Sequence, residues 1–498
     1  MSTTPSELPR RETEIEQRDE STVKQFGYRP ELRRSMGNFS AFALSFSGIG
    51  ITVSIFATIA FVWGQGGPAG IWTWPIASVF YILLGLVFGE LSTKIPLAGY
   101  SYQWGSKLAN QSFGFFVGFF AYLAFQVGVT GTNLVFAPYF AQTIGWNASS
   151  RQLLGIAAAA FLAQGLLLIW GLRIAARVNN VAVVTEIIGG FLTGLALLIW
   201  ALARHVHSFS YSFNTGTAPH GSHYLTPFAL SFLLAAFVYS AWEAPADLAE
   251  ETRDVIGTTP RAMRRSLIAT AIIGMVMLLG FTLAMPDLKQ TLASSVPGSF
   301  VVQHAFGSAY ARIFLVVVDV SIFATALAIL AMTSRVVFSM ARDGVLPLSG
   351  PLKRVSRRSG GPMIAIVTVT IIAIIITIVA QKLSVVASVA SIFYALVYLL
   401  ITVAYFVRRD KFPTPPGAFT LGRAGRPIMV AVALFMVFIV GSLTLPKINH
   451  SVARASLAFV GITVVFYVYS ALTRGRHGPS GAEPAYEGSS ETPPADKP

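Results

Sequence analysis

The sequence predicts an all-α integral membrane protein with twelve transmembrane helices, and both its composition and the length of its apolar runs support this class. Of the 498 residues, 54% are apolar and only 12% are charged, whereas soluble domains carry about a quarter charged residues. The apolar residues gather in runs of roughly 20, the length that crosses a hydrocarbon core of about 30 Å. Because such runs are too long for barrel strands, helices must satisfy the backbone hydrogen bonds in lipid.

Twelve runs meet this length, and polar segments separate them. Helices one to ten form a core over residues 39–410, and two extra helices follow at 411–473. The flanking residues 1–38 and 474–498 are polar, so both are expected to be disordered tails, and the first lacks the apolar stretch of a cleavable signal. The predicted spans are residues 40–63, 69–92, 113–143, 152–170, 179–203, 226–248, 265–285, 309–340, 362–380, 384–407, 427–445 and 454–472.

The lysines and arginines of the loops predict the orientation of the chain. With the N-terminus inside, the inner loops hold eighteen Lys and Arg and the outer loops hold seven, and such an excess is typical of cytoplasmic loops. We therefore expect a multi-pass protein of the cytoplasmic membrane with both termini in the cytoplasm. Because the basic residues lie in short loops, the net charge of +14 reflects topology, and no nucleic-acid partner is predicted.

Two predicted spans contain residues that interrupt a helix. The first span contains Gly48 and Gly50, and the sixth contains Pro245, which lacks a backbone donor and clashes with an earlier carbonyl. Small residues also permit close helix packing, which is the other interpretation of the first span. The breaks lie five spans apart, which favours an inverted five-plus-five repeat over residues 39–204 and 225–408, with helices one and six discontinuous.

Discontinuous helices expose backbone groups in mid-membrane, and these groups predict a binding site for a small zwitterion. Amides after Gly48 lie at the positive end of a half-helix and suit a carboxylate, while carbonyls near Tyr239 suit an ammonium or a cation. Gln126 is a polar residue midway along the third span, and Trp242 either covers the solute as a gate or packs in the core. The predicted substrate-binding residues are Ser47, Gly48, Ile49, Gly50, Ile51, Gln126, Val238, Tyr239, Ser240, Ala241 and Trp242.

Four stretches in consistent order resemble the amino acid–polyamine–organocation superfamily, most closely its amino acid/choline permease branch. Residues 47–50 (SGIG) match its unwound first helix, and residues 96–104 (PLAGYSYQW) resemble its P-x-A-G-G-x-Y-x-W loop, with Tyr100 at the second glycine. Residues 239–262 resemble its sixth helix and the following loop, and residues 334–347 resemble the end of its eighth helix. The resemblance covers residues 35–410 and implies a permease that imports an amino acid or related amine by alternating access.

Four polar residues inside the spans are candidates for coupling and gating: Glu186, Glu243, Ser321 and Thr325. By the resemblance, Glu186 falls where some proton-coupled relatives carry a lysine in place of sodium; a structural hydrogen bond is the alternative. Glu243 ends the break in the sixth span, where it either links the solute to helix movement or caps free amides. Ser321 and Thr325 lie where sodium-coupled relatives use hydroxyls, although such hydroxyls often bond to their own helix.

Two further charged groups have structural interpretations. Glu90 and Lys94 are four residues apart, which predicts a surface ion pair. Arg335 lies near the inner end of the eighth span, where an inner gate or a structural ion pair is expected.

The same residues argue against other classes of membrane protein. An enzyme is not predicted, because the span assignment places all seven histidines in loops or tails and no acid, base or metal cluster emerges. A channel filter signature is missing, and a carrier built from two parallel six-span halves would need a longer central loop. A choline, polyamine or other organocation carrier or exchanger stays open, as does a non-transporting solute sensor on the same fold.

The predicted partners are a small amino acid or amine and the lipid bilayer. No cofactor is expected beyond a coupling proton or sodium ion, and the absence of cysteine removes thiolate metal sites. The identity of the solute, the coupling ion and the oligomeric state are left open by the sequence.

Overall fold

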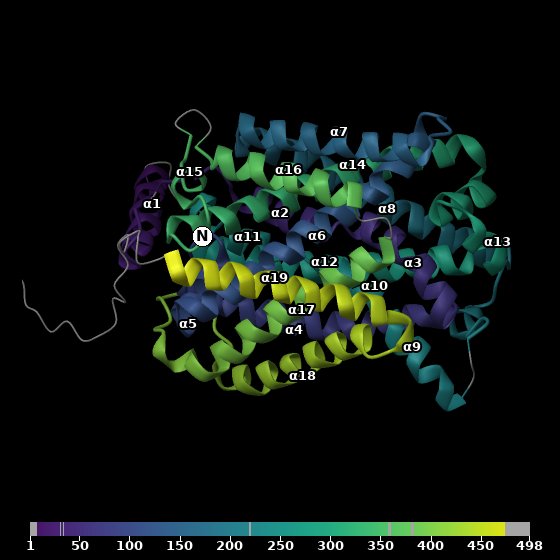
Figure 1. Ribbon diagram of the computed structural model, residues 1–498. Coiled ribbons are helices and arrows are strands. Elements are labelled where there is room, and N and C mark those ends of the chain that lie inside the picture. The colour runs from purple at the N-terminus through teal and green to yellow at the C-terminus, as the bar shows by residue number, and fades with distance from the viewer. Residues whose placement is uncertain are drawn as a thin grey trace, which may run out of the picture.

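The computed structural model describes residues 7–29, 31–32, 34–218, 221–356, 360–379 and 383–473. Within these residues the regular structure is helical, and the helices of the spans run lengthwise in one bundle (Figure 1). The α-helices are α1 (Glu7–Gln25), α2 (Asn38–Ile49), α3 (Ile51–Gly66), α4 (Thr73–Lys94), α5 (Tyr100–Leu108), α6 (Gln111–Thr143), α7 (Ser150–Trp170), α8 (Leu172–Ala203), α9 (Leu225–Ser231), α10 (Leu233–Val238), α11 (Ala244–Asp247), α12 (Val255–Leu283), α13 (Leu288–Ala293), α14 (Pro297–Arg342), α15 (Ser349–Leu352), α16 (Met363–Val379), α17 (Leu383–Arg408), α18 (Gly425–Thr444) and α19 (His450–Thr473).

The described residues contain ten helical segments that are long and apolar enough to cross a membrane. Two shorter apolar helices, Leu225–Val238 and Met363–Val379, lie where the sixth and ninth spans are predicted. The all-α, multi-pass membrane class is therefore confirmed, and the count of twelve stays a prediction. The helix that contains the seventh predicted span, α12, begins ten residues before that span, at Val255, and its first part is polar, with Arg261 and Arg264.

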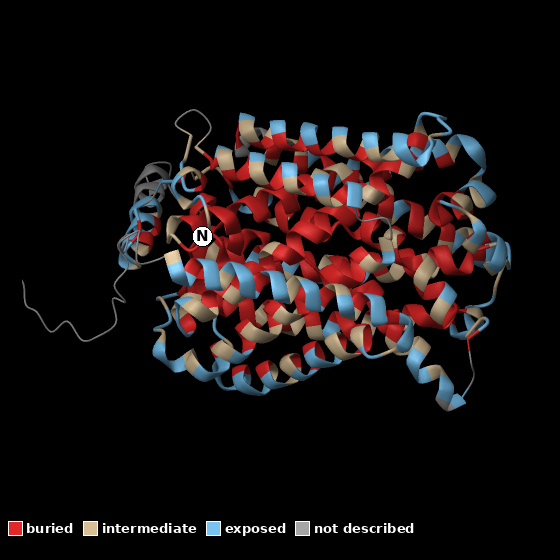
Figure 2. Cartoon of the chain, in the orientation of Figure 1, coloured by how far each residue is buried: buried red, intermediate tan, exposed pale blue. Residues whose placement is uncertain are grey.

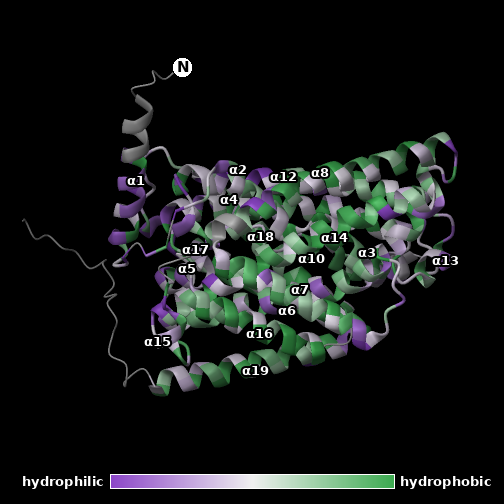
Figure 3. Cartoon of the chain, turned by 90° about the horizontal axis from the view of Figure 1, so that it is seen from above, coloured by the Kyte–Doolittle hydropathy of each residue, from purple (hydrophilic) through white to green (hydrophobic). Residues whose placement is uncertain are grey.

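The burial pattern fits a bundle dissolved in lipid. The interior helices are buried along their length, and the outer faces of the bundle are exposed (Figure 2). Large apolar side chains point outward from the outer helices, including Leu166 and Trp170 of α7, Ile375 of α16 and Val465 of α19. The same helices are hydrophobic in the view from above (Figure 3). Since soluble proteins rarely expose such large apolar patches, the bilayer is the solvent for this surface.

The broken segments lie inside the bundle. α2 packs against α8, α12 and α14, and α3 packs against α10, α9 and α14. α14 contains a kink at Gly307, which takes a φ of 82°. His304 lies in the first part of α14, before this kink, so its predicted loop position is wrong.

The predicted disorder of the N-terminal tail is wrong for residues 7–25, which form α1 at one end of the bundle (Figure 1). We call this end, which also holds α5 and α15, the α1 end. The tail contacts the bundle through Asp19, which is buried and whose Oδ2 accepts the Asp254 amide at 2.9 Å; Arg34, itself in the tail, lies 3.7 Å from this carboxylate. Burial raises the pKa of the Asp19 carboxyl, although Arg34 opposes this shift.

Some predictions fall outside the described residues. The C-terminal tail 474–498 lies outside them, as do Arg357, Arg358 and Lys382, which contribute to the predicted orientation.

Glu90 is not part of a surface ion pair, which corrects the sequence interpretation. Its side chain is 1% exposed, and its carboxylate accepts hydrogen bonds from Arg409 at 2.9 Å and from the Leu421 amide at 2.6 Å. Lys94 lies 3.7 Å away and is itself mostly buried. The partner Arg409 follows the end of α17, so the pair joins α4 to α17 and a spacing rule within one helix cannot find it.

Candidate functional site

The first break separates α2 from α3. α2 ends at Ile49, Gly50 adopts a left-handed backbone with a φ of 53°, and α3 begins at Ile51. A Cβ at Gly50 would overlap with the side chain of Thr325 on α14. Glycine at this position is therefore needed by the backbone and by the neighbouring helix.

The second break separates α10 from α11. α10 ends at Val238, the residues from Tyr239 to Glu243 are not helical, and Ala241 takes a φ of 58°. A left-handed conformation is unusual for alanine and is commonly found at functional sites. Pro245 lies in the first turn of α11, where its missing N–H costs no hydrogen bond.

The two breaks touch each other. A Cβ at Gly48 would lie only 2.5 Å from the carbonyl oxygen of Ala241. Next to this contact, the Ser45 hydroxyl donates to the Trp242 carbonyl at 2.5 Å and lies 2.6 Å from the Ser266 hydroxyl of α12. Residues 47–51 and 238–242, which are predicted to lie close together, are thus neighbours in the structure.

Two buried polar atoms at these breaks have no hydrogen-bond partner within the described part of the protein: the Ser47 hydroxyl on α2 and the Trp242 Nε1 in the second break. The Tyr394 hydroxyl of α17 lies next to Ser240 in the second break. Because buried polar atoms are nearly always paired, a polar ligand or a water molecule is expected to complete the hydrogen bonds of the Ser47 and Trp242 side chains.

Glu186 caps the N-terminus of α3. Its side chain is 2% exposed on α8, and its Oε1 accepts the backbone N–H of Thr52 at 2.9 Å. A carboxylate is favourable at this position because the first-turn amides of a helix are unpaired and carry partial positive charge. From the sequence, these amides are expected to bind a solute carboxylate, whereas in the structure the Thr52 amide is bound by a protein carboxylate.

The two hydroxyl candidates, Ser321 and Thr325, lie on α14 beside the first break. The hydroxyls of Thr52 and Ser321 lie next to the Glu186 carboxyl group. Thr325 contacts the glycine hinge at Gly50 and donates its hydroxyl to the Ser321 carbonyl at 2.9 Å, so it bonds to its own helix as the alternative interpretation holds. Three helices thus bring carboxyl and hydroxyl oxygens together at one end of the first break.

Glu243 is held by two tyrosines from different elements. Its side chain is fully buried, and its two oxygens accept hydrogen bonds from Tyr100 of α5 at 2.9 Å and from Tyr398 of α17 at 2.8 Å. The Trp242 ring lies against Phe88 of α4 and against Tyr398, with centroids 5.4 and 5.7 Å apart. The second break is therefore joined to α5 and α17 through one carboxyl group and its aromatic neighbours.

The remaining predicted site residues take other contacts. The Gln126 amide donates to the Val369 carbonyl of α16 at 3.1 Å. The Tyr239 hydroxyl lies 2.6 Å from the Ser78 hydroxyl of α4, and the Ser240 hydroxyl donates to the Phe237 carbonyl. The side chains of Ile49, Ile51 and Val238 are buried in the apolar core.

Arg335 forms a structural ion pair rather than a contact with the breaks. Its guanidinium donates to both oxygens of Glu251, at 2.7 and 3.1 Å, and both side chains are almost fully buried. Nearby, Arg342 donates to both oxygens of Glu250 at 3.1 Å. These pairs hold the segment after α11 against the last turns of α14.

Replacing Arg335 with methionine is expected to destabilise the protein by about 3–5 kcal/mol, because Glu251 is left buried without a partner. Thermal unfolding of the purified protein measures the effect. The double variant Arg335→Met/Glu251→Met should recover much of the lost stability, and equal destabilisation by the single and double variants would contradict a paired role.

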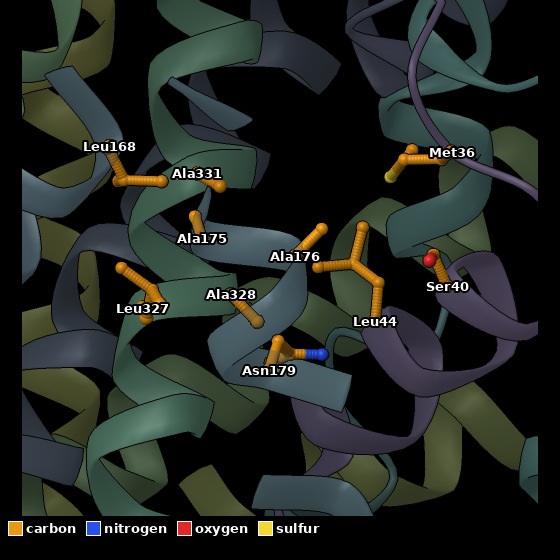
Figure 4. Close-up of a pocket in the computed structure, with 10 residues that line it drawn as sticks. All are labelled: Met36, Ser40, Leu44, Leu168, Ala175, Ala176, Asn179, Leu327, Ala328 and Ala331. Atoms are coloured by element: carbon orange, nitrogen blue, oxygen red, sulfur yellow. The ribbon is translucent and has the colours of Figure 1, made fainter. Parts of the chain in front are cut away.

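A small cavity lies beside the half of α2 nearest the α1 end, between α2, α8 and α14 (Figure 4). Its lining is mainly alanine and leucine, with Asn179 of α8 among them. Both polar atoms of the Asn179 side chain are buried without a partner in the described residues. The packing around this part of α2 is therefore incomplete.

Comparison with known proteins decides the family. The family model described as "Amino acid permease" matches residues 36–467, which include both breaks and the coupling candidates. The chain belongs to the amino acid permease family. The recognition of this superfamily from the four sequence stretches is therefore confirmed.

Similar members of the family are named for different solutes. Amino-acid permease BAT1 of Arabidopsis thaliana is 24% identical, over 90% of this chain and 94% of the relative. The GABA-specific permease of Saccharomyces cerevisiae is 24% identical, over 93% and 86%. The thiamine transporter thi9 of Schizosaccharomyces pombe is 24% identical, over 90% and 84%. These relatives are transporters by name, and none is named as an enzyme.

Five residues at the site of this family member were not predicted from the sequence. Ser45 and Thr52 flank the first break, but small hydroxyl residues in a span carry little signal. Tyr394 and Tyr398 are four residues apart on α17, which places two hydroxyl-bearing rings on one helix face. For Tyr100, the first residue of α5, the signal is that it replaces the second glycine of the family's loop motif.

Proposed function

We propose that this member of the amino acid permease family is a secondary active transporter that imports an amino acid or a related small amine by alternating access. The observation that carries the proposal is the contact between two unwound segments, surrounded by buried polar atoms that lack partners. Unwound backbone inside a membrane bundle is tolerated where it lines a binding site. A small solute with an ammonium and a carboxylate would bind to backbone carbonyls and amides of the two breaks.

The proposal includes the predicted topology. We place twelve spans in the cytoplasmic membrane with both termini and the α1 end facing the cytoplasm, in two inverted repeats of five. Support comes from the loop charges and from the breaks, which lie in the first predicted span and in the sixth. Under this arrangement the solute enters from the α13 end and leaves toward the α1 end.

Glu186 would couple a proton or a sodium ion to solute binding. The ionised carboxylate accepts the Thr52 amide at the start of α3, and charge-assisted bonds of this kind are strong. Protonation of Glu186, or its ligation of sodium together with the Thr52 and Ser321 hydroxyls, would weaken its hold on the amide. The freed amide then becomes available to the solute carboxylate, so ion and solute bind together.

Glu243 would transmit solute binding to the α1 end. It lies between the second break and the tyrosines of α5 and α17, so a shift of the break must move or release these hydroxyls. The Tyr100 and Tyr398 hydrogen bonds thus form an inner gate that opens when the break rearranges.

Replacing Tyr398 with phenylalanine is expected to slow turnover about tenfold while the protein stays folded, because one oxygen of Glu243 loses a charged hydrogen bond. Tyr100→Phe should act in the same direction. Uptake and exchange in proteoliposomes give the rates, and Tyr469→Phe on the exposed face of α19 is the matched control. If Tyr398→Phe turned over as fast as this control, the Tyr398 hydrogen bond would not be part of a gate.

A carrier or exchanger of choline, polyamines or another organocation is the second candidate. It is favoured by the buried Glu243 carboxyl beside the rings of Trp242, Phe88 and Tyr398, since cations bind to carboxylates and to aromatic faces. A thermal-shift screen of the purified protein against amino acids, polyamines and choline separates the candidates, because a bound solute stabilises the folded form. Uptake of the stabilising solute into proteoliposomes then distinguishes a carrier from a sensor, and stabilisation without uptake would contradict transport.

A further inference from the structure

A large cavity at the α1 end takes no part in the proposed transport site. Its volume is about 800 Å³, which is within the range of small-molecule sites. Its walls come from four places: the segment after α1, the helix α5 with the turn into α6, the residue Asp343 after α14, and the segment after α17. The cavity is therefore formed by parts of the chain that are far apart in sequence.

Three cations line this cavity: Lys107, Arg408 and Lys411. No side-chain hydrogen bond or ion pair to a carboxylate holds any of them within the described residues, whereas the neighbouring Arg409 pairs with Glu90 and Arg426 pairs with Asp410. The Lys107 ammonium lies 5.9 and 5.4 Å from the ring centroids of Phe26 and Tyr28. Burial lowers the pKa of Lys107, although the Asp343 carboxylate opposes this shift.

The one carboxylate in the lining is already engaged. Asp343 accepts hydrogen bonds from the Tyr28 hydroxyl at 3.0 Å and from the Tyr102 hydroxyl at 2.9 Å. The lining therefore keeps an excess of positive charge over this single negative group. The N-terminus of α6, a helix of 33 residues with no acidic residue in its first turn, opens at the same cavity and adds partial positive charge.

We propose that this cavity binds a phosphate-bearing anion, supplied either by a soluble phosphorylated metabolite or by the headgroup of an anionic lipid. Lysine and arginine donors with a helix N-terminus are the groups that recognise phosphate. The rings of Phe26, Tyr28, Tyr102 and Phe412 line the same space and give the non-phosphate part of the ligand an apolar surface. Because Phe26 and Tyr28 belong to the segment after α1, a bound anion holds this segment against α5 and α14.

The test uses the purified full-length protein, its thermal unfolding and direct binding. In detergent, inorganic phosphate and ATP are titrated against chloride at equal ionic strength. In nanodiscs, phosphatidylcholine alone is compared with phosphatidylcholine containing phosphatidylglycerol. Stabilisation by phosphate or ATP identifies the soluble source, and stabilisation by phosphatidylglycerol identifies the lipid source.

The variants Lys107→Gln and Lys411→Gln are expected to weaken the binding of the stabilising probe at least about tenfold, because each removes a charged donor. Lys353→Gln is the matched control, since Lys353 is an exposed lysine after α15, outside the cavity lining. If Lys107→Gln does not fold, the comparison of Lys411→Gln with Lys353→Gln is sufficient by itself, because Lys411 is exposed. The proposal is overturned if no probe stabilises the protein beyond chloride or phosphatidylcholine, or if Lys411→Gln binds the probe as tightly as Lys353→Gln.

Discussion

Uptake is expected to fall to the level of empty liposomes when Gly48 is replaced by leucine. A Cβ at this position would lie 2.5 Å from the Ala241 carbonyl oxygen, so the side chain must push the two breaks apart. The obstacle is backbone rather than a flexible side chain, and overpacking of a tight contact already costs about 1–3 kcal/mol where side chains can move. The site between the breaks loses its shape, while the apolar helices that insert the protein are unchanged.

Gly64→Leu is the matched control for this substitution. Gly64 lies on the same helical span, is exposed, and has open space where a Cβ would be added. Both variants should be recovered from membranes in similar amounts with similar elution on size exclusion. Solute binding by Gly48→Leu at the level of Gly64→Leu would show that the contact between the breaks is not part of the site.

Glu186→Gln is expected to abolish accumulation driven by an ion gradient while exchange of solute continues. Glutamine keeps an oxygen that accepts the Thr52 amide but cannot gain or lose a charge, so the local fold at the start of α3 is preserved. Without a change of charge, the ion no longer determines whether the amide is free. Proteoliposomes with an imposed proton or sodium gradient measure accumulation, and counterflow without a gradient measures exchange.

The matched control is Asp410→Asn, which neutralises an exposed carboxylate outside the membrane helices that pairs with Arg426. It should retain gradient-driven accumulation within about twofold, because exposed ion pairs contribute little. Undiminished accumulation by Glu186→Gln, with normal exchange, would refute the coupling role. Loss of both activities together would instead indicate a structural role for Glu186.

The membrane class and the positions of the breaks could be predicted because they depend on local physics. A run of about 20 apolar residues must form a helix in lipid whatever its neighbours are. Glycine at Gly50 and proline at Pro245 disturb a helix through their own backbone properties. The structure places a left-handed residue at the first position and a non-helical segment directly before the second.

The contacts of the site could not be predicted because they join residues that are distant in sequence. Glu186 meets the Thr52 amide 134 residues earlier, and Glu243 meets Tyr100 and Tyr398 across separations of 143 and 155 residues. Periodicity and spacing within one helix carry no information on such pairs. The same reason explains why Glu90, assigned to Lys94 by spacing, is bound mainly by Arg409.

The order of the N-terminal tail also could not be predicted from its composition. Residues 1–38 contain equal numbers of acidic and basic residues and few apolar ones, a composition typical of disorder. Hydrogen bonds to the bundle nevertheless hold part of this segment: the Asp19 carboxylate accepts the Asp254 amide, and the Tyr28 hydroxyl donates to Asp343. This part of the tail is thus ordered by its contacts with the bundle rather than by an apolar core of its own.

A cryo-EM structure of the full-length protein in nanodiscs, with the solute from the thermal-shift screen bound, tests the central claim most directly. We expect solute density in contact with both residues 47–51 and residues 238–243, with helices one and six interrupted at these positions. Solute density elsewhere in the bundle, or two uninterrupted helices through these residues, would contradict the claim that paired unwound segments form the binding site.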